Sequence, residues 1–104
     1  MKELAGDDEP GLFDVLVDSF LVHAPAHLDA LEAAARNADL EDLVKSAHGL
    51  KSSAATMGAV VLADICRHLE EAGRRGMLDG VGALVARARE AFDTARCALN
   101  EARG

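Results

Sequence analysis

One histidine in this chain stands where its side chain could react with a group on another molecule. At roughly 100° per residue, His48 points about 130° away from a predicted buried stripe of apolar residues and is expected to face solvent. An imidazole titrates near neutrality, so a useful fraction is unprotonated and nucleophilic. Such a side chain suits reaction with an anionic group. The stripe consists of Leu43, Ala47, Leu50, Ala54 and Met57.

The residues that flank His48 on its predicted face are small or cationic. Lys51 lies one turn along, where it could neutralise charge on an anionic group, although a solvated lysine at the edge of the core would show the same spacing. Small neighbours would leave clearance for a partner. We therefore expect His48 and Lys51 to carry the chemistry, and a partner to dock on Val44, Lys45, Ser52 and Ala55.

The sequence around His48 resembles the histidine phosphotransfer (HPt) family. That family has a Leu two residues after the histidine, then a Lys, small residues and a Gly-Ala pair, which are Leu50, Lys51, Ser53, Gly58 and Ala59 here. One departure is Ser52, where the family most often has Gly. Further matching positions cover nearly the whole chain: Phe20, Pro25, Leu31, Ala34, Asp39, Leu40, Leu62, Cys66, Leu69, Glu70 and Gly76.

The resemblance implies a role in a phosphorelay. A receiver domain carrying an aspartyl phosphate would dock over His48, which would attack in line and later pass the phosphoryl group to another receiver. The partners would be receiver domains of response regulators, a hybrid sensor histidine kinase, or both. No Gly-rich nucleotide loop or Walker motif occurs, so we expect a phosphoryl carrier rather than an enzyme. No cofactor is expected, and any Mg²⁺ would belong to the receiver.

Two other interpretations stay open. A helical adaptor would bind a kinase or response regulator without accepting phosphate, although Lys51 and the small residues argue against it. The phosphoacceptor domain of a sensor kinase would need a stable dimer and usually an acidic residue directly after the histidine, where this chain has Gly49. A monomer is the default expectation. Met1 and the acidic leader favour a free-standing protein over a fragment of a hybrid kinase. The sequence does not identify the cognate kinase and response regulator or the direction of phosphoryl flow.

Composition favours one all-helical domain in the cytoplasm. Half of the 104 residues are hydrophobic, and Trp and Tyr are absent. The chain has 11 Lys and Arg against 18 Asp and Glu, and the net charge of −7 disfavours nucleic acids and anionic membranes as partners. Neither a signal peptide nor an apolar segment of bilayer-spanning length is present. We expect a single HPt-like domain over residues 1–104, with a flexible leader at 1–8 and a frayed tail at 100–104.

Helical periodicity predicts an antiparallel four-helix bundle with an additional N-terminal cap helix. The cap helix is expected from about Pro10 to Val22, because Pro25 should break it and begin the next helix. That second helix would run to a turn at Asn37–Asp39. The resemblance to the HPt family implies the same bundle.

The later helices are predicted from their caps and apolar stripes. Asp39 should cap the helix that carries His48, and Gly58 should end it in a left-handed conformation. The next helix should extend to Gly73–Gly76, and Asp79 should cap the last one. Its inward stripe is Val81, Leu84, Val85, Ala88, Phe92, Ala95 and Leu99.

Other polar residues give weaker signals. Cys66 and Cys97 are expected to be buried free thiols rather than a disulfide or a metal site. His23 and His27 have a metal-compatible i, i+4 spacing, but Pro25 lies between them and no third ligand is near, so we expect no metal. A solvated His68 is expected, while Arg74 and Arg75 are secondary docking candidates.

Overall fold

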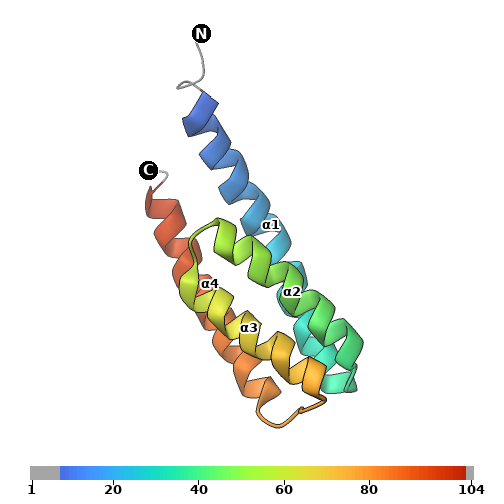
Figure 1. Ribbon diagram of the computed structural model, residues 1–104. Helices are drawn as coiled ribbons and strands as arrows, with labels where there is room; N and C mark the ends of the chain where they lie inside the picture. The colour runs from blue at the N-terminus through green and yellow to red at the C-terminus, as the bar shows by residue number, and fades with distance from the viewer. Residues whose placement is uncertain (1–7, 103–104) are drawn as a thin grey trace.

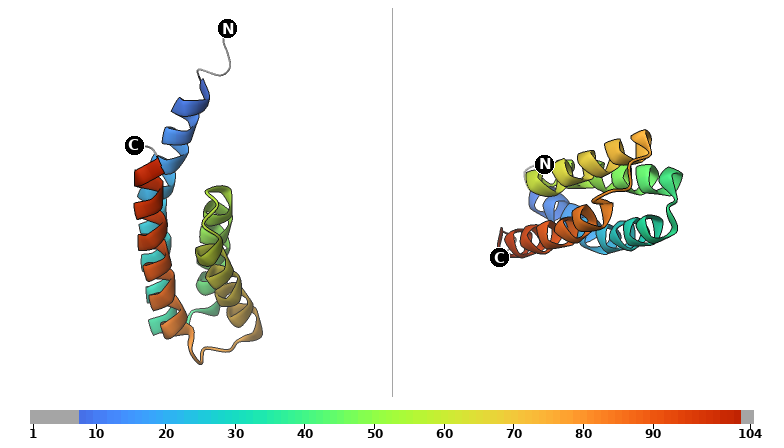
Figure 2. Two further views of the ribbon diagram at one scale, coloured as in Figure 1. Left: turned by 90° about the vertical axis from the view of Figure 1, so that its left-hand side faces the viewer. Right: turned by 90° about the horizontal axis from the view of Figure 1, so that it is seen from below.

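The computed structural model describes residues 8–102, which form four α-helices (Figure 1). α1 spans Asp8–Asn37, α2 spans Leu40–Thr56, α3 spans Val60–Arg75 and α4 spans Val81–Ala102. Each helix packs against two neighbours, with α1 and α4 in one layer and α2 and α3 in the other (Figure 2). The all-α antiparallel four-helix bundle is confirmed.

The predicted break at Pro25 is wrong, and with it the separate cap helix. α1 continues through Pro25 for 30 residues in all. An interior proline removes one helical hydrogen bond and adds a clash, at a cost of about 3 kcal/mol. Each large apolar side chain buried on either side of it contributes about 1.5–3 kcal/mol, which outweighs that cost. These large buried residues are Val17, Phe20, Leu28 and Leu31.

The predicted ends of α2 and α3 are confirmed. The side chain of Asp39 accepts a hydrogen bond from the backbone N–H of Asp42 at 3.1 Å and caps α2. Gly58 follows the last turn of α2 with φ +74°, and Gly76 closes α3 with φ +69°. Both glycines adopt the left-handed conformation that ends helices at little steric cost. The short turn at Gly58 joins α2 to α3 and sets them antiparallel.

The start of α4 differs from the prediction. Gly80, with φ +79°, precedes the helix, and its carbonyl accepts a hydrogen bond from the N–H of Leu84. Asp79 therefore lies one residue outside the N-cap position. At the other end, α4 continues to Ala102, into the segment where fraying is expected. Residues 1–7 of the predicted leader and 103–104 of the predicted tail lie outside the described residues.

Leu, Ala and Val side chains fill most of the core, and α1 packs against α4 both in the core and at the surface. The rings of Phe20 and Phe92 meet edge-on with centroids 5.5 Å apart. At the surface, Arg89 of α4 donates to Asp29 and Glu32 of α1 at 2.6 and 2.5 Å. Among the helices of residues 8–102, none is both long and apolar enough to cross a membrane.

The two cysteines lie in different environments. Cys66 is buried in the core, and this burial raises the pKa of its thiol to about 12. Cys97 is exposed, so its predicted burial is wrong. At roughly 100° per residue, Cys97 falls on the side of α4 opposite the buried Val85 and Phe92.

Candidate functional site

His48 lies near the middle of α2 on the side that faces away from the bundle. Four residues of the predicted stripe point into the core, and the imidazole points outward with 60 % of its side chain exposed. The exposure expected from the helical pattern is therefore confirmed. Buried stripe residues that hold this orientation are Leu43, Ala47, Leu50 and Ala54.

A buried carboxylate from α3 contacts one edge of the His48 ring. The side chain of Glu70 is only 2 % exposed, and its Oε2 lies 3.2 Å from Nδ1 of His48. An ionised carboxylate accepts hydrogen bonds and donates none, so Nδ1 carries the proton and donates it to Glu70. Nε2 is then the nitrogen with a free lone pair, and it has no partner within residues 8–102. Glu70 thus fixes both the tautomer and the orientation of the ring.

Two cationic side chains stabilise the ionised form of Glu70. Lys51 donates from Nζ to Oε1 at 2.6 Å, and the guanidinium of Arg74 pairs with Oε2. The hydrogen bond from Lys51 is the largest cause that holds the pKa of Glu70 below its ordinary value; burial opposes this shift, while His48 and Arg74 reinforce it. The carboxylate is therefore ionised at neutral pH despite its burial.

The structure brings His48 and Lys51 together through this shared carboxylate. The side chain of Lys51 is 31 % exposed, and its ammonium is hydrogen-bonded to Glu70 instead of standing free in solvent. An ammonium group has three donors, so two remain for oxygens of a group that reaches His48. The arrangement combines an exposed imidazole, a buried carboxylate behind it and an ammonium beside it.

The predicted docking residues divide into two groups. Lys45, Ser52 and Ala55 are exposed on α2. Val44 is half-buried, because its Cγ2 packs where α3 passes closest at Gly73. Of the secondary candidates, Arg74 pairs with Glu70, while Arg75 pairs with Glu71 one turn earlier at 3.0 Å.

Glu70 is the site residue that sequence reasoning missed. In the sequence it stands only as one position of the longer motif around His48. A signal was present, since Glu70 follows Cys66 by four residues and so continues the buried side of α3. A carboxylate on a buried face needs partners, and that requirement points to the cations and the imidazole found here.

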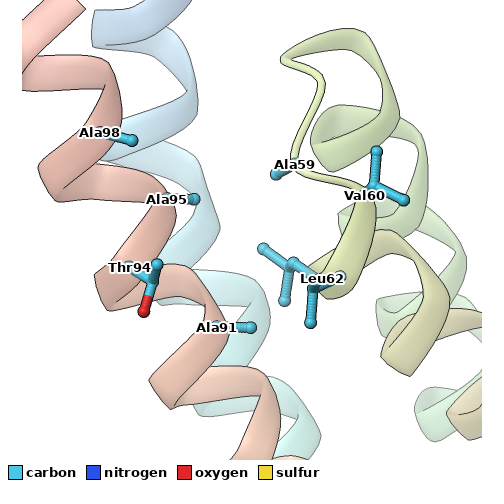
Figure 3. A pocket seen from close by; sticks show the side chains of 8 residues that line it. Ala59, Val60, Leu62, Ala91, Thr94, Ala95 and Ala98 are labelled. Carbon is cyan, nitrogen blue, oxygen red and sulfur yellow. The ribbon is translucent and has the colours of Figure 1, made fainter.

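Other parts of the surface do not share these features. His23 lies on the uninterrupted α1, and its Nδ1 donates to the carbonyl oxygen of Ser19 at 2.8 Å. Within residues 8–102, no three His, Cys, Asp or Glu side chains are placed to hold a metal ion. A pocket of about 220 Å³ between α3 and α4 is lined by Ala, Val, Leu and Thr side chains (Figure 3). That lining provides no ionisable group.

Two comparisons find similar proteins. Residues 15–98 match the family model described as Hpt domain. Among solved structures, the chain is similar to the crystal structure of histidine-containing phosphotransfer protein B (HptB) from Pseudomonas aeruginosa PAO1, with 35% sequence identity and a TM-score of 0.84. The match covers 94% of this chain and 82% of that chain. A comparison with curated protein sequences finds no match.

Proposed function

Because this chain belongs to the Hpt domain family and has a histidine phosphotransfer role in a phosphorelay, we propose that His48 is its phosphoryl acceptor. The observation that carries the assignment is the contact between Nδ1 of His48 and the buried Glu70 carboxylate. In the neutral ring this contact places the proton on Nδ1 and the lone pair on the outward, exposed Nε2. An imidazole held in that tautomer can attack without prior loss of a proton.

The proposed reaction follows from these positions. The lone pair of Nε2 attacks the phosphorus of a receiver's aspartyl phosphate, the bond between phosphorus and the aspartate oxygen breaks, and the aspartate carboxylate leaves. The proton stays on Nδ1, so the phosphorylated ring gains positive charge. Glu70 stabilises that charge at 3.2 Å, and Lys51 interacts with the phosphoryl oxygens. The reverse sequence on another receiver regenerates neutral His48.

We also propose the setting in which this reaction occurs. The partners are receiver domains of response regulators or of a hybrid sensor kinase, and they dock over Lys45, Ser52, Ala55 and the exposed part of Val44. The chain acts as a cytoplasmic, monomeric carrier without an ATP site. Exposure of the first three residues around the reactive ring supports this docking face.

A transfer experiment tests the assignment. A panel of purified receiver domains is phosphorylated with labelled acetyl phosphate and mixed with the wild-type chain, which should gain an acid-labile, base-stable label. His48→Gln should gain none. His68→Gln is the matched control, because His68 is exposed on α3 and should leave labelling unchanged. A wild-type chain that binds receivers but stays unlabelled would support the adaptor interpretation, and label on His48→Gln would assign another residue.

A further inference from the structure

A second imidazole lies against the backbone of α2 directly beside His48. Gly49 follows His48, and a Cβ atom built on Gly49 would lie 2.8 Å from Cε1 of His27 in α1. The same atom would lie 3.4 Å from each ring nitrogen of His27. The His27 ring therefore occupies the space that a side chain at position 49 would need. Because Cε1 is closest and both nitrogens are equally distant, the ring meets α2 at Cε1, with one ring nitrogen on either side of the contact.

His27 keeps its hydrogen-bonding capacity. The side chain is half-buried, and no hydrogen bond or ion pair joins it to another group within residues 8–102. His23, one turn earlier on α1, differs because Ser19 holds its Nδ1. A neutral imidazole has one donor and one acceptor, and leaving them unmet in a covered interface is unfavourable. His27 is thus suited to a partner that supplies the complementary groups.

The position of His27 places it at the edge of the proposed docking face. Together with Ser53 and Thr56 of α2, it lines a groove of about 230 Å³ between α1 and α2. Lys51 and Glu70 lie on the opposite side of His48, toward α3. A transient interface covers up to about 600 Å² of each partner, and one of standard size covers about 800 Å². A receiver centred on His48 therefore covers His27 as well.

We propose that His27 is a docking residue for phosphotransfer, whose ring nitrogens hydrogen-bond the receiver that covers His48, and that Gly49 is required because it gives the ring its place. The inference rests on the proposed function, since it needs a receiver at His48. His27 contacts the partner away from the reacting atoms. It therefore sets receiver affinity and selectivity, and leaves the chemical step unchanged.

Binding measurements separate this inference from the transfer chemistry. All variants are made in a His48→Gln background, which carries no phosphoryl group, and titrated with the panel of receivers activated by beryllium fluoride. His27→Ala should weaken binding of the preferred receiver about tenfold, the effect expected for one lost hydrogen bond. His27→Gln keeps a donor and an acceptor and should bind within about threefold of the parent. His68→Ala should bind like the parent.

A double-mutant cycle tests the role of Gly49. Gly49→Ala alone should weaken binding because its methyl group displaces the His27 ring. In the His27→Ala background the same change should have little further effect, since no ring is left to displace. Equal binding by His27→Ala and the parent for every receiver would overturn the proposal, as would additive effects in the cycle. Transfer to the wild-type chain is scored separately, so an unlabelled chain whose binding still depends on His27 would overturn only the phosphoacceptor assignment.

Discussion

At the scale of single residues, Glu70 is where the contacts of the site converge. One buried carboxylate accepts from an imidazole, an ammonium and a guanidinium. Burying an ionised group is unfavourable unless partners of opposite charge surround it, and here Lys51 and Arg74 meet that condition. The same contacts orient His48. Stability and reactivity therefore depend on one side chain.

Replacing Glu70 by Gln should lower both properties. Glutamine keeps the size but removes the charge, so the cationic phosphohistidine ring loses its stabilising anion, and transfer to His48 should slow about tenfold. The free energy of unfolding at neutral pH should fall by about 1–3 kcal/mol, because Lys51 and Arg74 lose their partner. Receiver-to-His48 transfer rates and urea unfolding measure the two effects. Glu71→Gln, at an exposed position, is the control and should leave the transfer rate unchanged.

The lowered pKa of Glu70 predicts that the stability of the fold depends on pH. The pKa of Glu70 is lower in the folded chain than its ordinary value of 4.5, chiefly through the hydrogen bond from Lys51. Its ionised form therefore stabilises the fold fully above about pH 4.5, and this stabilisation is lost as the pH falls through the folded-state pKa. The stability difference between wild type and Glu70→Gln should shrink on acidification. A difference that stays constant from neutral to strongly acidic pH would contradict this account.

Sequence reasoning reached some of these residues because helical periodicity is local. His48 and Lys51 lie within one turn of a single helix, so their relative placement follows from 3.6 residues per turn. Glu70 comes from another helix, and its contact with His48 depends on the axial register between α3 and α2. No periodicity within either helix encodes that register.

At the scale of helices, the approach of α2 to α3 depends on a buried glycine. A Cβ on Gly73 would lie 2.6 Å from Cγ2 of Val44 and 3.4 Å from the carbonyl oxygen of Leu40. Glycine allows α3 to pass this close to α2. Glu70 lies on the same helix only three residues earlier, so this close approach also supports the reach of its carboxylate to His48.

Matched glycine substitutions test the helix contact. Gly73→Ala should destabilise the fold by about 1–3 kcal/mol, because the methyl group overlaps Cγ2 of Val44. Gly82→Ala should stabilise it by about 0.5–1 kcal/mol, since Gly82 lies in α4 with no atom within 4 Å of the added methyl. Thermal or urea unfolding measures both. A Gly73→Ala chain as stable as Gly82→Ala would show that the helices are not held this closely.

Helix boundaries show where local sequence signals are sufficient. Asp39, Gly58 and Gly76 act within one turn of the chain, and the predicted ends hold at these positions. Pro25 gives an equally strong local signal, yet the helix continues through it because residues on both sides share one core. Packing of α1 against α2 and α4 outweighs the tendency of Pro25 to break the helix. No local sequence pattern contains information about that packing.

At the scale of the whole molecule, one thiol lies at the surface of the bundle and the other in its interior. Cys97 is exposed on α4, whereas Cys66 is fully buried and the pKa of its thiol is raised to about 12. Because the thiolate is the reactive form, Cys66 is protected both by burial and by protonation. Its reactivity therefore depends on opening of the core.

Thiol labelling converts this difference into a measurement. In native conditions near neutral pH, iodoacetamide should modify one thiol per chain, and Cys97→Ser should remove that reaction. Cys66 should react only as urea unfolds the bundle, with the same midpoint as circular dichroism. Rapid modification of Cys66 in the native Cys97→Ser chain would contradict the buried position described here.

The start of α1 and the end of α4 lie at the same end of the bundle (Figure 1). His48 lies near the middle of α2 with its side chain exposed. A fluorescent protein or a bead coupled at that end would stand clear of the reactive ring. Immobilised chains should therefore still present their imidazoles to soluble receivers. The geometry makes the protein a practical bait for recovering its own signalling partners.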